Sequence, residues 1–428
     1  MSVEILSSDG QKVTVQVTVD ISGSLLEAEQ RILSSINECG CVLTHDAIAQ
    51  FDTDGSPIQT GDIRWTRRGR SPKTYQTPYG EVSVERNVYQ NSRGGKIHVP
   101  LVAAARIIHR ATPRFAKMVS DKYARLNANE VCSDLSENHG RTFSRAGVQK
   151  LTESIGAIAT AKEESWEYST PKLEQEVSTV VCGLDGAMLQ CVDTGWREAM
   201  AGTLSLYDGD GKRLHTTYFG AAPEYGKQAF FERFTRELAH IKAQYPDALY
   251  LGIADGSACN WTYLEQHTDQ QILDFYHVSE YLAKASHAAF PQQVDQAKRQ
   301  AWLRERCHNL KHEADYAKTL LKELKGLRRR RNMYEANRED LEDAIRYVSN
   351  HLSMMDYASN IENMLPIGSG VTEAACKTLI KQRFCRSGMR WKDAGIKTVM
   401  SLRSLVLTPG RWDQFWEKID KWGVPSIK

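Results

Sequence analysis

The stretch "VVCGLDGAML", residues 180–189, is an apolar run that meets an aspartate followed by a glycine. A buried strand of a parallel sheet is a short, nearly unbroken apolar run of this kind. The pattern predicts a strand over residues 177–184 that stops at Asp185 and Gly186. A strand that ends on a carboxylate raises the question of what that carboxylate does.

A second stretch of the sequence repeats this pattern of an apolar run followed by Asp-Gly. In "ALYLGIADGS", residues 248–257, Asp255 and Gly256 follow another apolar run. Two strand ends would then present carboxylates, each followed by a glycine that lets the backbone turn sharply. Taken singly, an Asp-Gly pair is more often a turn than a catalytic group. The repetition is a first indication of an active site.

Length and composition limit the class of protein. A chain of 428 residues exceeds what one hydrophobic core usually supports, so two to four domains are expected. With 41% hydrophobic and 25% charged residues the composition is that of a globular protein. The sequence contains neither an apolar run long enough to span a membrane nor a signal peptide pattern. We therefore expect a cytoplasmic protein with no membrane partner.

The nine cysteines include no Cys-x-x-Cys pair and predict reduced thiols. Cys39 and Cys41 lie close to His45, but one intervening residue is too short for the usual zinc spacing. Ordinary buried thiols are therefore preferred over a metal site at these positions.

Positive charge is concentrated near the C-terminus, although the net charge is only +2. Such clustering is typical of a phosphate-binding face, and a solvated helix surface is the alternative. Eight basic residues stand against the single acid Asp393: Lys377, Lys381, Arg383, Arg386, Arg390, Lys392, Lys397 and Arg403.

The first two parts of the chain differ in pattern. Residues 1–100 predict a β-rich region of short strands and turns, with alternation in residues 12–20 and 80–89. Residues 101–165 predict helices, including two that flank "HGRTF", with Gly140 as C-cap of one and Ser144 as N-cap of the other.

The second of these helices has one apolar face, which predicts a helix-turn-helix. Two helices joined by a short turn, with long polar side chains near the start of the second, are typical of motifs that read a DNA major groove. Any helical hairpin shares this periodicity, so the pattern alone leaves both interpretations open. Val148, Leu151 and Ile155 are spaced to face the core, and Arg145, Gln149 and Lys150 face outward as candidate DNA contacts.

Residues 170–282 alternate strands and helices in the order three strands, helix, strand, helix, strand, the last strand being "QILDFYHV" at 271–278. This is the order of an RNase H-like α/β core, in which acids from the first strand, the fourth strand and a late helix converge. Residues 283–365 read as an all-helical insertion, and 366–428 as the C-terminal helices of the core.

The late helix begins in "GSGVTEAACKTLIKQRFCRSGMRW", residues 368–391, with Glu373 near its start. Spacing by four would place Glu373, Lys377 and Lys381 on one helical face. The lysines would then meet phosphate oxygens, or Glu373 and Lys377 form the ion pair of any exposed helix. One helix face does not separate the two interpretations.

Three carboxylates suit phosphodiester chemistry. Two divalent ions can activate the attacking oxygen and stabilise the leaving one, and acidic side chains must hold them. Asp185, Asp255 and Glu373 are the candidate ligands. Oxygen ligands favour Mg²⁺, with Mn²⁺ as a substitute and two ions per site.

The chain resembles the bacterial insertion-sequence transposases of the ISKra type, relatives of the Mutator-like DDE superfamily. The resemblance covers roughly residues 75–428, and its most specific part is the GSG-x-x-E approach followed by Gly-Met-Arg-Trp. The blocks that carry it are "GLDGAML", "IADGSACNW", "DFYHVSEYL", "GSGVTEAACKTLIKQRFCRSGMRW" and "LRSLVLTPGRWDQFW".

The resemblance implies a function. Asp185, Asp255 and Glu373 correspond to the DDE triad, and Asp274 and His277 to a C/D-x-x-H motif. Water would attack at the end of the element, and the freed 3′ hydroxyl would then attack target DNA. The implied partners are inverted-repeat DNA at the transposon ends, target DNA and a second copy of the chain, in a nucleoid-associated homodimer or higher oligomer.

Two further site candidates have a second interpretation. His277 would contact the scissile phosphate, with Asp274 fixing its tautomer, or it is a hydrogen-bonded structural residue. Trp302 would stack on a splayed base, although a buried core tryptophan is the more common case. Arg390 belongs to the Gly-Met-Arg-Trp block and is a further candidate DNA contact.

Two other functions fit the same sequence. A catalytically inactive descendant would keep the fold as a DNA-binding regulator, and the presence of all three carboxylates argues against it. A structure-selective nuclease would use the same acids on RNA or branched DNA.

Overall fold

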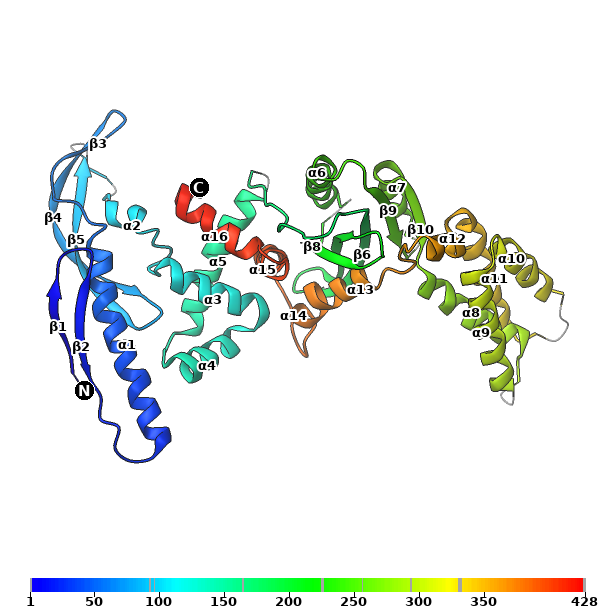
Figure 1. Ribbon diagram of the computed structural model, residues 1–428, viewed down its shortest axis with the longest axis horizontal. Coiled ribbons are helices and arrows are strands. Elements are labelled where there is room, and N and C mark those ends of the chain that lie inside the picture. Colours follow the sequence, from blue (N-terminus) through cyan, green and yellow to red (C-terminus); the bar gives the residue numbers. More distant parts are fainter. Residues whose placement is uncertain are drawn as a thin grey trace. The chain divides into compact units, whose positions relative to one another are not determined.

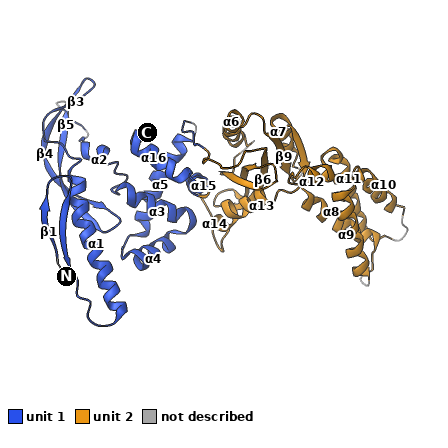
Figure 2. Cartoon of the chain, in the orientation of Figure 1, with its two compact units in different colours: residues 1–169, 394–406, 410–428 blue, residues 170–393, 407–409 orange. Residues whose placement is uncertain are grey.

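The protein is a mixed α/β chain in two compact units, seen here in a computed structural model (Figures 1 and 2). The structure describes residues 2–91, 94–95, 97–163, 165–224, 227–255, 257–292, 295–329 and 333–425. Unit 1 is formed by Met1–Ser169, Ala394–Val406 and Gly410–Lys428, and unit 2 by Thr170–Asp393 and Leu407–Pro409. No helix among the described residues is long and apolar enough to cross a membrane.

The N-terminal part of unit 1 contains two antiparallel sheets and a long helix. Strands β1 (Ser2–Ser8) and β2 (Val13–Thr18) pair with each other, and β3 (Ile58–Thr60), β4 (Ile63–Gln76) and β5 (Glu81–Asn91) form the second sheet in that order. The strands predicted from the alternation in residues 12–20 and 80–89 are thus confirmed.

The expectation of strands and turns alone was wrong for the segment between these sheets, which is helix α1 (Leu25–Ala49). Its start is a capping box, in which the Ser24 hydroxyl accepts from the Glu27 N–H and the Glu27 carboxylate accepts from the Ser24 N–H. Apolar residues such as Leu25 and Ile36 are exposed on this helix.

Four helices follow in unit 1: α2 (Pro100–Ala104), α3 (Pro113–Arg125), α4 (Ala128–His139) and α5 (Arg145–Lys162). The predicted caps are confirmed. Gly140 ends α4 with a φ of 58°, and the Ser144 hydroxyl accepts from the Gly147 N–H at 3.0 Å at the start of α5. Val148, Leu151 and Ile155 are buried, as their spacing predicts.

The C-terminal helices α15 (Asp393–Leu407) and α16 (Arg411–Trp422) complete the core of this helical part. Leu402 and Phe415 pack in one apolar cluster with Val148 and Leu151 of α5. The sequence predicted that residues 366–428 belong to the catalytic core. Instead, α15 and α16 bury their apolar faces in unit 1.

Unit 2 is built on a five-stranded sheet with the order β10-β9-β6-β7-β8. Its first three strands along the chain pair antiparallel, and β9 and β10 then add parallel to β6. The strands are β6 (Thr179–Cys191), β7 (Gly195–Tyr207), β8 (Arg213–Ala221), β9 (Leu249–Ala254) and β10 (Gln270–Leu273), with helices α6 (Gln228–Gln244) and α7 (Ala258–His267) in the connections.

Two strand ends differ from the prediction. Strand β6 does not stop at Asp185, because its pairing with β7 continues to Cys191. Gly186 lies inside the strand, where an added Cβ would meet Glu198 Oε1 of β7 at 2.2 Å. Strand β10 ends at Leu273, so the rest of "QILDFYHV" is a helix start. Gly256 lies outside the described residues.

The predicted insertion consists of helices joined by short turns, and none of its described residues is in a strand. Figure 1 shows its helices grouped beside the β10 edge of the sheet. They are α8 (Phe275–Ala289), α9 (Gln296–His312), α10 (Tyr316–Leu327), α11 (Glu335–Asn350), the short turn η2 (Leu352–Met354) and α12 (Tyr357–Glu362). The chain then returns to the sheet through α13 (Gly370–Ala375), the π-helical turn η3 (Cys376–Lys381) and α14 (Gln382–Phe384).

Candidate active site

The first two candidate carboxylates lie on neighbouring strands. Strands β6 and β9 pair in parallel, and the last pair joins Gly183 to Ile253. Two residues further along, this register sets Asp185 opposite Asp255, and neighbouring strands are about 4.8 Å apart. The two acids therefore meet at one place on the sheet, although Asp185 lies within its strand and Asp255 directly follows its own.

Burial makes Asp185 an unusual carboxyl group. Its pKa is raised above the ordinary value, first by burial and also by the negative charge of Asp255. Hydrogen bonds from the Cys376 thiol and the Gly186 N–H, together with the His277 side chain, act in the opposite direction without reversing the shift. Ionisation of Asp185 therefore costs free energy, and a bound cation would offset this cost.

Helix α13 brings Glu373 to the same strands. The neighbouring Thr372 is buried, and its hydroxyl lies 2.8 Å from that of Thr203 on β7. The helix fits closely over Gly183, where an added Cβ would lie 1.9 Å from Thr372 Oγ1. Glu373 itself is exposed, and its Oε1 accepts from the Ser369 hydroxyl at 3.1 Å.

Substitution of Gly183 by Ala should therefore displace α13. We expect a loss of stability of about 1–3 kcal/mol from overpacking. Gly209→Ala is the matched control, since an added Cβ there meets nothing within 4 Å. Denaturant unfolding tests this, and equal stability of both variants would contradict it.

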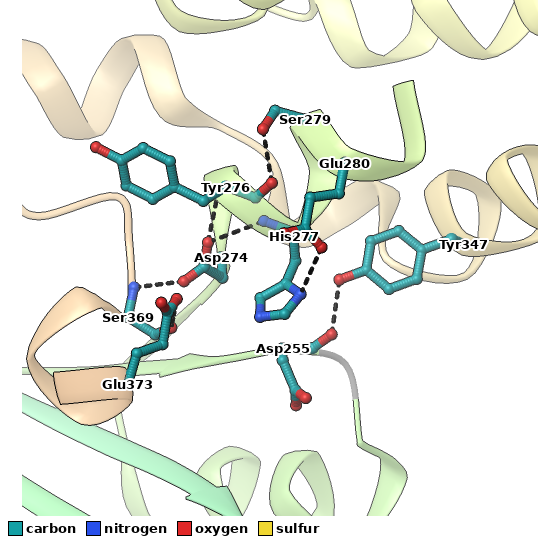
Figure 3. A network of polar contacts seen from close by, with 9 residues as sticks. All are labelled: Asp255, Asp274, Tyr276, His277, Ser279, Glu280, Tyr347, Ser369 and Glu373. Carbon is teal, nitrogen blue, oxygen red and sulfur yellow. Dashed lines mark hydrogen bonds and ion pairs between the residues drawn. The ribbon is translucent and has the colours of Figure 1, made fainter. Parts of the chain in front are cut away.

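Asp274 has a structural position. It is fully buried and caps α8, with Oδ1 accepting from the N–H groups of Tyr276 at 2.6 Å and His277 at 3.2 Å. Its Oδ2 accepts from the Ser369 N–H at 2.6 Å, at the start of α13 (Figure 3). Asp274 thus ties α8 to the helix that carries Glu373.

The expected contact between Asp274 and the His277 imidazole is absent from the described residues. The Asp274 carboxylate binds backbone N–H groups instead, and His277 Nδ1 lies 3.7 Å from Glu280 Oε2. Figure 3 shows the ring pointing toward Asp255 and Glu373. His277 is only partly exposed, and its charge acts on Asp185, so the histidine belongs to the same site.

The helical insertion also contacts the site, through a residue that sequence reasoning missed. The Tyr347 hydroxyl of α11 donates to the backbone carbonyl of Asp255 at 2.6 Å. Its ring stacks on Tyr281 of α8 with centroids 4.0 Å apart. No sequence motif marks Tyr347 or Cys376, because both depend on contacts between distant segments.

The predicted face of Glu373, Lys377 and Lys381 is altered by the π-helical turn that begins at Cys376. Spacing by four residues assumes an α-helix, and a π turn widens it. Both lysines are exposed, and no ion pair joins Glu373 to Lys377 in the described part of the chain. The lysine charges thus remain available for phosphate.

The other basic residues of this region divide into two groups. Arg383 is buried with its guanidinium 5.0 Å from the Trp391 ring, and buried Arg403 donates to the Ala124 carbonyl. These two residues are structural. Fewer than the eight basic residues between Lys377 and Arg403 are therefore accessible to a phosphate. Arg390 is exposed and donates to the Val192 carbonyl at 3.2 Å.

The candidate DNA contacts on α5 are accessible. Arg145 and Lys150 are exposed, and Gln149 is half-buried. Trp302, in contrast, is buried inside the insertion, and its indole N–H donates to Glu323 Oε1 at 3.0 Å. Base stacking by Trp302 is therefore corrected to a core role.

The thiols and carboxylates were also considered as metal ligands. All nine cysteines are free thiols, as expected. Among the described residues, no three or more His, Cys, Asp or Glu side chains gather closely enough to hold a metal ion. The oxygen ligands of Asp185, Asp255 and Glu373 nevertheless fit Mg²⁺ by type, and the pKa of Asp185 is raised by burial and by the negative charge of Asp255.

Comparison with known proteins adds no assignment: no protein-family model matches the chain, and no curated protein is similar to it in sequence.

Proposed function

We propose that this protein is a DDE transposase that cuts DNA at the ends of a mobile element and joins the freed 3′ hydroxyl to target DNA. The observation that carries the proposal is the parallel pairing of β6 and β9, which ends two residues before Asp185 and Asp255, together with the charge of Asp255 that acts on Asp185. Helix α13 packs on β6 at Gly183 and adds Glu373. Asp185, Asp255 and Glu373 would together form the ligand set that two divalent ions need.

The architecture of unit 2 supports an RNase H-like core. The order β8-β7-β6-β9-β10, with three antiparallel strands followed by two parallel ones, is the order expected of that fold. The acids belong to its first strand, the end of its fourth strand and a late helix. The helical insertion lies between the second and third acids, as the resemblance implies.

The chemistry follows from the charges. Mg²⁺ or Mn²⁺, when bound, would activate the attacking oxygen and stabilise the leaving one. Asp185, Asp255 and Glu373 would hold the ions, and partial burial of Asp185 strengthens its attraction for a cation. Lys377 and Lys381 would contact the phosphates on either side.

DNA recognition is assigned to unit 1. Helices α4 and α5 with the turn at Gly140 would form a helix-turn-helix, and Arg145, Gln149 and Lys150 would contact the duplex. Both ends of the element must be held during the reaction, so we propose a homodimer or higher oligomer as the active form.

The wild-type protein should cut labelled DNA that carries the element's own end in the presence of Mg²⁺ or Mn²⁺, and should not cut it in EDTA. The physical reason is that the carboxylates alone repel the phosphate. The measurement is product formation on denaturing gels, with a generic DNA hairpin as the comparison substrate.

The outcomes separate the candidate functions. Cleavage restricted to the element's end supports the transposase. Equal cleavage of the hairpin favours a structure-selective nuclease. Tight binding of the end without any cleavage favours an inactive DNA-binding regulator.

A further inference from the structure

A tight turn precedes the helical part of unit 1. Between α2 and α3, the Ala111 N–H donates to the Ile108 carbonyl at 2.8 Å, and the Ile108 N–H donates to the Ala111 carbonyl at 3.0 Å. The two central residues, His109 and Arg110, have φ values of 44° and 65°. Two left-handed residues between such a bonded pair form a type I′ hairpin turn.

This turn has an unusual sequence. Type I′ turns favour Asn-Gly because both central residues need a positive φ, which is unfavourable for histidine and arginine. Strained residues of this kind persist only where the surrounding structure fixes them. Here Gln76, at the end of β4, provides that support: its N–H donates to the Arg110 carbonyl at 2.7 Å, and its carbonyl accepts from the Thr112 N–H at 2.9 Å.

The two strained residues face solvent, and Arg110 carries a positive charge. His109 and Arg110 are both exposed. In the part of the chain that the structure describes, neither side chain has a hydrogen-bond or ionic partner. Arg106 of the same segment differs, because its Nε donates to the Asp420 carbonyl at 3.0 Å and so serves the fold.

The turn lies beside the candidate recognition helix. A groove of about 570 Å³ in unit 1 is lined by His109 and Ile108 of the turn and by Lys150, Glu153 and Ile158 of α5. Lys150 also has no ionic partner among the described residues. The turn and α5 thus line one groove, with the Lys150 cation on α5 and Arg110 next to His109 in the turn.

We infer that the Ile108–Ala111 turn is a second DNA-contact element, which holds the phosphate backbone of the duplex that α5 contacts. Contacts to phosphate fix the register of a protein on DNA, and a rigid turn places cations for this purpose without loss of side-chain and loop freedom. The carboxylate of Glu153 would repel a phosphate, so the backbone is expected on the side of Arg110 and Lys150. This inference rests on the proposed DNA-binding function.

The double variant His109→Asn/Arg110→Gly separates binding from folding. It inserts the residues that a type I′ turn prefers, so the melting temperature should rise by about 2–4 °C. Its affinity for a labelled random-sequence duplex at low salt should fall about tenfold, as expected for a lost contact between charged groups. The slope of log K against log salt should fall by about 1.

Two single variants complete the experiment. Arg110→Lys keeps the charge and should retain most of the affinity, whereas Lys150→Ala should weaken binding as the double variant does. An unchanged affinity and salt slope in the double variant, together with weaker binding by Lys150→Ala, would overturn the role of the turn and leave the proposed function intact. Failure of the wild type to bind any duplex would overturn both.

Discussion

Replacing Asp185, Asp255 or Glu373 by its neutral amide should lower the rate of DNA cleavage by about 10³–10⁴-fold and leave DNA binding within a few-fold of the wild type. The ions that these carboxylates would hold supply several kcal/mol of charge stabilisation, and about 1.4 kcal/mol corresponds to a tenfold change in rate. Binding should persist because the candidate DNA contacts of α5 lie in unit 1, a compact unit of its own.

Glu362→Gln is the matched control for Glu373→Gln. Glu362 is the other acid before the basic region, and it is exposed at the end of α12. Its substitution should leave the cleavage rate unchanged. Full activity of Glu373→Gln together with loss of activity in Glu362→Gln would make Glu362 the third ligand. Full activity of the amide variants at Asp185, Asp255 and Glu373 would reject the site.

The fold of the Asp185→Asn variant can be checked separately. The pKa of Asp185 is raised by burial and by Asp255, so in the metal-free chain its ionised form destabilises the fold as the pH rises above the ordinary value of 3.8. A neutral amide therefore should not lower the melting temperature without metal. In the wild type, added Mn²⁺ should raise the melting temperature, and in the amide variant it should not.

Local patterns in the sequence predicted the parts of the fold that depend on neighbouring residues. The caps Gly140 and Ser144 and the buried face of α5 are set by residues a few positions apart, and the structure confirms them. The strands of unit 2 were found for the same reason. Helix α1 was missed although its capping box is a sequence signal of a helix start.

Features that depend on tertiary contacts were not predictable. Strand β6 continues through Asp185 because β7 pairs with it along its full length, and an isolated Asp-Gly pair gives no sign of this. Arg383 and Trp302 are buried, so their charge or aromatic character suggested roles that their burial excludes. The contact of Asp274 with Ser369 joins residues 95 positions apart.

That contact predicts the largest effect on stability. Replacement of Asp274 by Ala should lower the free energy of unfolding by about 2–4 kcal/mol, because α8 loses its cap and the buried Ser369 N–H loses its acceptor. Asn should cost less, since its carbonyl can still cap α8 while its amide faces the Ser369 N–H. The expected order of stability is wild type, then Asn, then Ala, measured by denaturant unfolding.

Asp295→Ala is the control, because Asp295 precedes α9 without a cap hydrogen bond and its exposed pair with Lys298 contributes little. The Asn variant should also cut DNA more slowly, because a shift at Ser369 displaces the start of α13 and with it Glu373. If Asp274 were instead a reacting group that contributes nothing to the fold, Ala and Asn would abolish cleavage equally, and neither would change the unfolding curve.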